Sequence, residues 1–140
     1  MPGDSFRLQR FLDAQEPVYA QVVTELREGR KRSHWMWFIF PQIAGLGSSP
    51  TTQFFAISSL EAARAYLTHP VLGARLREVT AIVNSIEGRS AYAIFSTPDD
   101  LKFHSSITLF AQVAEAGSLF VTAIDKYFGG EADRKTLSLL

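Results

Sequence analysis

The sequence predicts an all-α fold, a compact single-domain bundle of about six to eight short helices over residues 1–140. Three observations lead to this prediction. Apolar side chains recur at helical spacing along most of the chain. No segment alternates convincingly with a period of two, so an isolated strand would leave its backbone groups unpaired. The 140 residues are 46% apolar and contain no cysteine, which suits one domain whose core needs no disulfide.

Two short helices are predicted near the N-terminus. Their apolar positions are Leu8, Phe11 and Leu12 in the first, and Val18, Val22 and Leu26 in the second. Pro17 suits a first helical turn, and Gly29 is typical of the residue just past a helix end. A basic cluster follows, made of Arg27, Arg30, Lys31 and Arg32. We interpret it as solvated charge that caps the helix, with an anion-binding rim as the alternative.

Residues 33–40 are ambiguous between a strand and a helix. Their aromatic and β-branched side chains suit a buried strand, whereas Ser33 could cap a helix and Pro41 would end one. Because no partner strand is predicted, we expect a short buried helix. The glycines, serines and proline that follow predict a loop over residues 42–52.

The central part of the chain predicts two more helices. Ser58 and Glu61 have the spacing of a capping box, which would open a helix through Leu67. Pro70 fits the first turn of the next helix, which should end at Gly88. The apolar stripe of this second helix is Leu72, Leu76, Val79, Val83 and Ile86.

The C-terminal part predicts three helices. Thr97 as N-cap and Pro98 at the first position, followed by two acidic residues, should open a helix that reaches about Ala116. Its core stripe is Phe103, Ile107, Phe110 and Ala114. A further helix over residues 119–128, a break at Gly129 and Gly130, and a short terminal helix complete the fold.

Composition excludes several classes of function. Fourteen basic and fourteen acidic residues give a net charge of zero, so general nucleic-acid binding is not expected. The longest apolar run, residues 35–40, is far shorter than the roughly 20 residues of a membrane-spanning helix, and no leader pattern is present. Three isolated histidines and no cysteine argue against a metal site, and no cofactor is implied. We expect a cytoplasmic monomer.

The first candidate site is a tryptophan-rich block with the loop after it. Trp35 and Trp37 could anchor the core or form a pocket wall that stacks a planar ligand. His34 is the candidate proton shuttle, although a lone histidine is more often a satisfied hydrogen-bonding group. The remaining candidates are hydrogen-bonding or flexible residues, namely Ser33, Gln42, Gly45, Gly47 and Ser48. The loop glycines could present amides to an anion, but a Walker lysine is missing.

The second candidate site is one face of the helix predicted from Thr97. Lys102, Ser105 and Ser106 share this face, beside the phenylalanine stripe, and could bind a phosphate or carboxylate. In the alternative interpretation, Lys102 extends along apolar surface and the serines hydrogen-bond to backbone carbonyls. His104 and Glu115 are expected to face solvent on the opposite side.

Several blocks of the sequence resemble one known family. The strongest is residues 33–42, SHWMWFIFPQ, with Gly45, Leu46, Gly47 and Ser48 after it. Further agreement lies in Glu61, Ala62, Tyr66, Leu67, residues 69–73, Arg75, Leu76, Asp100, Lys102, Ser105, Ser106 and residues 108–110. These blocks resemble a small, mostly bacterial and mainly α-helical family of uncharacterised proteins often labelled "calpastatin". The resemblance implies an all-α domain and no established reaction. Phe55 and Ser96 depart from it, where tyrosine and glycine are expected.

Two classes of function fit these features. The first is binding of a small polar or anionic metabolite, such as a nucleotide, with tryptophan stacking and metal-free acid–base hydrolysis by His34. Cleavage of a glycosidic bond in an ADP-ribose-like substrate is one version, and it would need an acid such as Glu61 in the pocket. The alternative is an interaction module that uses the aromatic block as a docking surface. Calpain inhibition is not expected, because disordered inhibitors need low hydrophobicity and the mean hydropathy here is +0.04.

Overall fold

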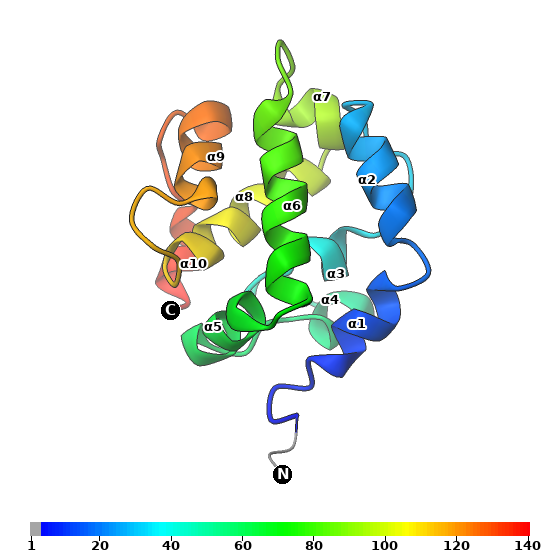
Figure 1. The fold of residues 1–140 in the computed structure, drawn as a ribbon. Helices are drawn as coiled ribbons and strands as arrows, with labels where there is room; N and C mark the ends of the chain where they lie inside the picture. Colours follow the sequence, from blue (N-terminus) through cyan, green and yellow to red (C-terminus); the bar gives the residue numbers. More distant parts are fainter. Residues whose placement is uncertain (1–3) are drawn as a thin grey trace.

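A computed structural model describes residues 4–140 of the protein as an assembly of α-helices (Figure 1). Within these residues β-type pairing is limited to an isolated parallel bridge between Ile43 and Ile57. The all-α fold class is therefore confirmed. The helices are α1 (Gln9–Gln15), α2 (Tyr19–Arg27), α3 (Met36–Ile39), α4 (Pro50–Phe54), α5 (Leu60–Thr68), α6 (Leu72–Ser85), α7 (Ala91–Phe95), α8 (Asp99–Ala111), α9 (Leu119–Phe128) and α10 (Arg134–Ser138).

Helix α8 is the central element of the fold. It contacts α3, α5, α7, α9 and α10, while α6 contacts α2, α5 and α9. In Figure 1, α6 runs across the front of the molecule, with α1 and α2 on one side and α9 and α10 on the other. The side chains of Phe103, Ile107 and Phe110 on α8 are completely buried, which confirms these positions of the predicted apolar stripe. A helix with so many neighbours can position side chains from distant parts of the sequence.

Aromatic contacts hold the elements together around α8. The Phe103 ring lies 5.1 Å from the Phe40 ring, edge to face, and 4.7 Å from the Phe95 ring, stacked. About two turns further along α8, the Phe110 ring lies 5.4 Å from the Tyr66 ring. Edge-to-face and offset pairs of this kind stabilise a core beyond the area they bury. They explain why phenylalanine is abundant in this sequence.

Most predicted helices are confirmed, with α9 matching the predicted range of 119–128. Gly29 follows α2 with a φ of +77°, as expected of a residue just past a helix end. The predicted segment 33–40 forms only the short helix α3, and its N-cap position, Trp35, makes no side-chain capping bond. Ser33 does not cap α3, because its hydroxyl donates to a carboxylate of α2 instead.

Some helix boundaries differ from the sequence-based prediction. The N-cap of α5 is Ser59, whose hydroxyl accepts from the amide of Ala62, so the capping box predicted from Ser58 is wrong. Pro98 occupies the N-cap position of α8, and the helix ends at Ala111 rather than near Ala116. Helices α4 and α7 were not predicted, although each begins with a serine cap, Ser49 and Ser90.

Helices α5 and α6 approach each other closely at Gly73. A Cβ atom at this position would lie 1.9 Å from the carbonyl oxygen of Leu67, the second-last residue of α5. The same oxygen accepts a hydrogen bond of 3.0 Å from Nη1 of Arg77. Only glycine leaves room for this approach, so Gly73 fixes how the two helices meet.

Candidate functional site

Trp35 of the tryptophan block is a core anchor. Its side chain is 1% exposed, and its indole Nε1–H donates a hydrogen bond of 3.0 Å to Oε1 of Glu25. A ring buried in this way has no face left to stack a ligand. The structure therefore favours the anchoring interpretation for Trp35 over the pocket-wall interpretation.

The carboxylate of Glu25 organises the segment that leads to Trp35. Its oxygens accept bonds from the Gln21 amide, the Arg32 and Ser33 backbone amides, the Ser33 hydroxyl and the Trp35 indole. Burial raises its pKa, but the bonds from Ser33, Arg32 and Gln21 outweigh burial and lower the pKa from 4.5 to about 2. Glu25 was missed from the sequence, although its spacing from Val22 and Leu26 places it on their apolar face.

Two lysines lie over the two tryptophans and flank one carboxylate. Lys31 Nζ is 5.1 Å from the Trp35 ring centroid and 2.8 Å from Oδ2 of Asp99. Lys102 Nζ is 4.9 Å from the Trp37 ring centroid and 3.8 Å from Oδ1 of Asp99. The Lys31 side chain is only 7% exposed, so the expectation that it is solvated is wrong. Its charge is neutralised mainly by Asp99.

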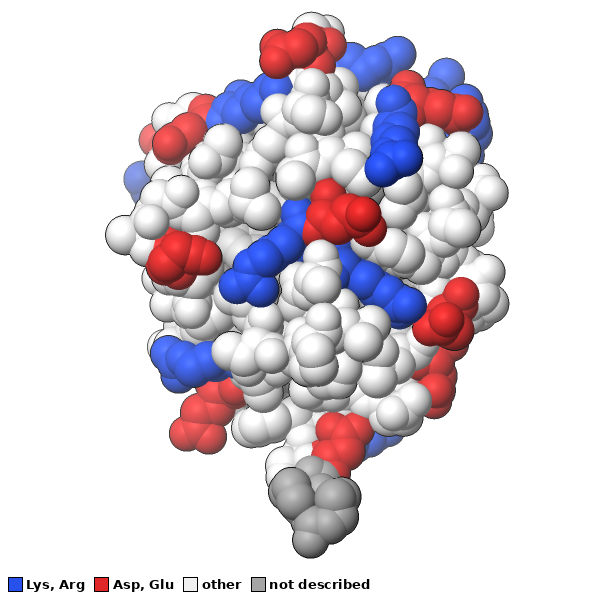
Figure 2. All heavy atoms as spheres, in the orientation of Figure 1, with Lys and Arg blue, Asp and Glu red and all other residues white. Residues whose placement is uncertain are grey.

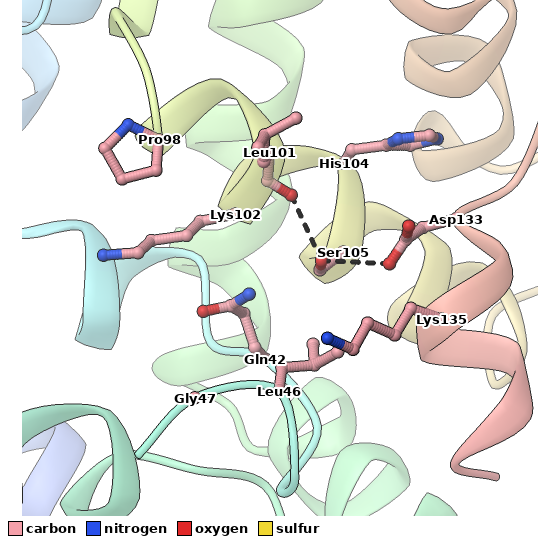
Figure 3. Close-up of a pocket in the computed structure, with 10 residues that line it drawn as sticks. All are labelled: Gln42, Leu46, Gly47, Pro98, Leu101, Lys102, His104, Ser105, Asp133 and Lys135. Atoms are coloured by element: carbon pink, nitrogen blue, oxygen red, sulfur yellow. Dashed lines mark hydrogen bonds between the residues drawn. The ribbon is translucent and has the colours of Figure 1, made fainter. Parts of the chain in front are cut away.

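A cavity of about 320 Å³ opens next to Lys102 (Figure 3). Three segments form it: the loop after α3, the start of α8, and the start of α10. In Figure 3, Gln42 rises from the loop between the side chains of Lys102 and Lys135. The lining residues are Gln42, Leu46, Gly47, Pro98, Leu101, Lys102, His104, Ser105, Asp133 and Lys135. The cavity thus combines two lysines, one aspartate and the imidazole of His104.

Asp133 and Ser105 join α10 to α8 inside the cavity. The Ser105 hydroxyl lies 3.1 Å from both the Leu101 carbonyl oxygen and Oδ2 of Asp133. Oδ2 also accepts from the amide and the hydroxyl of Thr136, at 3.2 and 2.6 Å. Burial raises the pKa of Asp133, but the bonds from Thr136 and Ser105 outweigh burial and lower the pKa below its ordinary value. Asp133 is therefore a fixed, ionised acceptor at neutral pH.

His104 forms one wall of the cavity and is held on two sides. Its ring stacks on Phe128 with the ring centroids 3.8 Å apart, and Nε2 lies 2.7 Å from the Glu131 carbonyl oxygen. A carbonyl oxygen only accepts, so Nε2 carries the hydrogen. The side chain is half-buried, which corrects the expectation that His104 faces solvent, because α9 covers that side of α8. Glu115 is exposed, as expected.

Residues 5–140 match the family described as "Protein of unknown function (DUF1810)". The chain belongs to this family. It is also similar to a solved structure, the crystal structure of the conserved hypothetical protein Rv1873 from Mycobacterium tuberculosis. The two sequences are 58% identical, the match covers 98% of each chain, and the TM-score is 0.96. No curated protein matches the chain.

The cavity of this DUF1810 chain brings together four of the residues predicted from sequence, Gln42, Gly47, Lys102 and Ser105. Trp37 adjoins them through its contact with Lys102. The two predicted candidate sites therefore meet in space, but only through part of each. The spacing of three residues between Lys102 and Ser105 was enough to predict that both side chains lie on the face of α8 that lines the cavity.

The other predicted site residues lie elsewhere. His34 is exposed and does not line the cavity, because the chain turns at Trp35 to bury the indole. Ser33 binds Glu25, and Ser106 is completely buried on the core side of α8. Gly45 packs against Leu139, and the carbonyl of Ser48 accepts from Gln53.

Glu61, the acid required for glycosidic cleavage, does not reach the cavity. It is exposed and lines a separate cavity of about 500 Å³ with Leu139 and Leu140. The hydrolase version that depends on Glu61 is therefore wrong for this site.

The α10 side of the cavity was missed from the sequence. Asp133 precedes Thr136 by three residues, which is the spacing of a helix N-cap, and this signal could have placed a helix start there. Nothing in the spacing of Lys135 distinguishes it from an ordinary surface lysine. Its position in the cavity follows from the packing of α10 on α8.

Within residues 4–140, no three acidic or histidine side chains cluster closely enough to hold a metal ion. No helix in this part of the chain has the length and apolar character needed to cross a membrane. The face in Figure 2 carries basic and acidic side chains interspersed among uncharged surface, rather than a continuous patch of one sign. This distribution agrees with the balanced charge of the sequence.

Proposed function

We propose that the protein binds a small anionic metabolite in the cavity between the loop after α3, α8 and α10. The observation that carries this proposal is that Lys102 and Lys135, 33 positions apart in the sequence, line the same cavity. Two ammonium groups at one concave site attract a phosphate or carboxylate by direct charge. With Asp133 also present, the three side chains supply one net positive charge.

The charge of Lys102 is held available to a ligand. Asp99 binds Lys31 at 2.8 Å and lies 3.8 Å from Lys102, so its carboxylate compensates Lys31 more strongly. The Trp37 ring attracts the Lys102 ammonium only modestly, so an anion can compete for this charge. Lys135 makes no ion pair with any described residue. Both lysines therefore have charge to offer an incoming anion.

The loop side of the cavity supplies polar contacts and close approach. The Gln42 side chain can donate two hydrogen bonds and accept others. At Gly47 a Cβ atom would lie 2.8 Å from Cγ2 of Thr52, so the absence of a side chain lets the loop close over this threonine. A ligand can then approach the backbone at Gly47 directly.

We propose binding and not hydrolysis, because His34 lies outside the cavity. The interaction-module alternative has less support. It requires a broad exposed tryptophan patch, whereas most apolar residues of the block are buried. The buried ones are Trp35, Met36, Ile39 and Phe40, and only Trp37 and Phe38 are half-buried.

The proposal is tested by titrating the protein with inorganic phosphate at low ionic strength, using calorimetry and amide NMR. Amide signals of Gln42, Gly47, Ser105 and Lys135 should shift together and saturate. Lys102→Ala and Lys135→Ala should each raise Kd by about tenfold, because each removes a charge-assisted bond. Added salt should also raise Kd.

Arg134→Ala is the matched control. Arg134 is exposed, adjoins Lys135 and does not line the cavity, so its removal changes the net charge without changing the site. Its Kd should stay within about twofold of that of the unmodified protein. Equal losses in all three variants would show nonspecific attraction, and an absence of saturable shifts at millimolar phosphate would refute the proposed function.

A further inference from the structure

Asp133 gives the proposed anion site a second, oppositely charged end. We infer that the ligand is a polyhydroxylated anion of small size, such as a phosphorylated sugar or polyol, rather than a nucleotide. This inference rests on the proposed function and adds the chemical class of the ligand to it. In it, the lysines bind the anionic group and Asp133 accepts hydrogen bonds from hydroxyl groups of the same molecule.

The acceptor on Asp133 is preorganised on one oxygen and open on the other. The three hydrogen bonds that described residues donate to this carboxylate, one from Ser105 and two from Thr136, end on Oδ2. The backbone amide of Asp133 is also fixed, by a 2.9 Å bond to the hydroxyl of Thr108. Among the described residues none donates to Oδ1, and Figure 3 shows that oxygen turned away from Ser105. A carboxylate oxygen held in this way at a cavity wall is matched by a hydroxyl or amine donor.

The combination of charges argues against a simple anion. Inorganic phosphate or a plain carboxylate would bind through Lys102 and Lys135, but it would leave the open oxygen of Asp133 without a hydrogen-bond donor. A molecule with an anionic group at one end and hydroxyl groups at the other satisfies both parts of the cavity. Gln42, from the loop side, offers a further donor and acceptor for such hydroxyl groups.

Size and lining argue against a nucleotide. A volume of about 320 Å³ lies near the lower limit for ligand pockets, so the cavity suits a compact molecule. Its lining contains no tryptophan, tyrosine or phenylalanine, and the ring of His104 is already stacked on Phe128. The nearest tryptophan, Trp37, has Lys102 over its ring. A nucleobase would therefore find no stacking surface in the cavity.

The test compares ligands that differ only in their hydroxyl groups. Glycerol 3-phosphate and propyl phosphate have the same number of carbon atoms and the same phosphate, but only the first carries hydroxyls. The unmodified protein should bind glycerol 3-phosphate about tenfold more tightly than propyl phosphate. One or two hydrogen bonds from hydroxyl groups to a charged acceptor account for a difference of this size. D-Glycerate, compared with glycerol 3-phosphate, distinguishes a carboxylate end from a phosphate end.

Variants at Asp133 identify the residue responsible. Asp133→Ser keeps a side-chain oxygen that can cap α10 but removes the open carboxylate oxygen. The tenfold preference should fall to about twofold or less, while propyl phosphate should bind at least as tightly as before, because a negative charge has been removed. Ser90→Ala removes a helix cap away from the cavity, so it should lower thermal stability and leave the preference intact.

The outcomes separate the two proposals. If propyl phosphate binds with the expected dependence on Lys102 and Lys135 but glycerol 3-phosphate binds no better, the inference about hydroxyl groups is wrong and the anion site stands. If neither phosphate binds, the proposed function fails. If adenosine 5′-monophosphate binds about tenfold more tightly than ribose 5-phosphate, the site recognises a nucleobase and the inference is overturned.

Discussion

The indole of Trp35 and the carboxylate of Glu25 form a buried hydrogen bond of 3.0 Å across ten residues of sequence. It joins α2 to the segment that precedes α3. The same carboxylate accepts hydrogen bonds from the backbone amides of Arg32 and Ser33 in that segment. The start of the tryptophan block is thus tied to an acidic residue of another helix. This relationship leads to the first two predictions.

Glu25→Gln should lower the free energy of unfolding by about 3 kcal/mol at pH 7, because one acceptor oxygen becomes an NH2 group that cannot accept and the other loses its charge. The folded-state pKa of about 2 lies below the ordinary value of 4.5. Ionised Glu25 therefore stabilises the fold fully above pH 4.5, and this contribution is lost as pH falls towards 2. Urea unfolding between pH 3 and 7 measures the difference.

Glu28→Gln is the control for Glu25→Gln. Glu28 lies just past the same helix, is exposed, and pairs with Arg32 at the surface. Its removal should change stability by less than about 1 kcal/mol. A difference between Glu25→Gln and the unmodified protein that stays constant down to pH 3 would contradict the role given to the carboxylate.

The two tryptophans should contribute unequally to stability. Trp35→Phe should cost about 2–3 kcal/mol, because it leaves a cavity and removes the indole donor from Glu25. Trp37→Phe should cost less than about 1 kcal/mol, since its ring is half-buried and phenylalanine retains part of the interaction with Lys102. Chemical unfolding of the two variants compares them directly. Equal costs would argue that the block stabilises the fold as a unit.

Ser96→Gly should stabilise the protein by about 1 kcal/mol. Ser96 has φ of 61° and ψ of −179°, a conformation that glycine adopts far more readily than other residues. Hydrogen bonds from its amide to Tyr92 and from the amide of Asp100 to its carbonyl keep it there. The resemblance that predicts glycine at this position agrees with the geometry. The melting temperature of the variant checks the prediction.

Ser85→Gly is the contrasting control for Ser96→Gly. Ser85 is the last residue of α6, where the same substitution removes helix propensity. It should lower the melting temperature, whereas Ser96→Gly should raise it. A lower melting temperature in both variants would mean that the Ser96 side chain stabilises the fold by more than its strained backbone destabilises it.

Gly73→Ala should prevent α5 and α6 from packing as they do. The added methyl group would lie 1.9 Å from a carbonyl oxygen, and backbone cannot move aside as a flexible side chain can. We expect a loss of about 3 kcal/mol or more, or failure to fold. Gly88→Ala, where a Cβ meets nothing within 4 Å and φ is +72°, should cost only about 1 kcal/mol of backbone strain. Similar losses at both positions would contradict the steric argument.

Helix existence was predictable from the sequence where the apolar period was long and the ends were marked. Helix α9 shows this, with apolar positions along its length and a glycine pair after it. Helices α4 and α7 were missed because five residues are too few to display a period. The start of α5 was displaced by one residue, since Ser58 and Ser59 are chemically equal candidates for the cap and only the fold selects between them.

The loop side and the α8 side of the candidate site were predictable from the sequence, whereas the α10 side was not. Lys102 and Ser105 share a helix face, so their spacing already places them together. Asp133 and Lys135 reach the same cavity through the docking of α10 on α8, a tertiary contact that no local pattern encodes. Trp35 and His34 were wrongly expected to line the site. Although they are neighbours in the sequence, the Trp35 side chain is buried in the core and the His34 side chain is exposed to solvent.

The position of Lys102 over Trp37 provides the protein with an optical reporter of its own cavity. The chain contains two tryptophans, and only Trp37 lies beside a lysine that lines the site. A ligand that draws the ammonium group away changes the electric field at this indole, and with it the wavelength and intensity of its emission. Trp35, sealed in the core, supplies a constant background. Unlabelled protein can therefore be screened by intrinsic fluorescence, and Trp37→Phe identifies the compounds whose signal arises elsewhere.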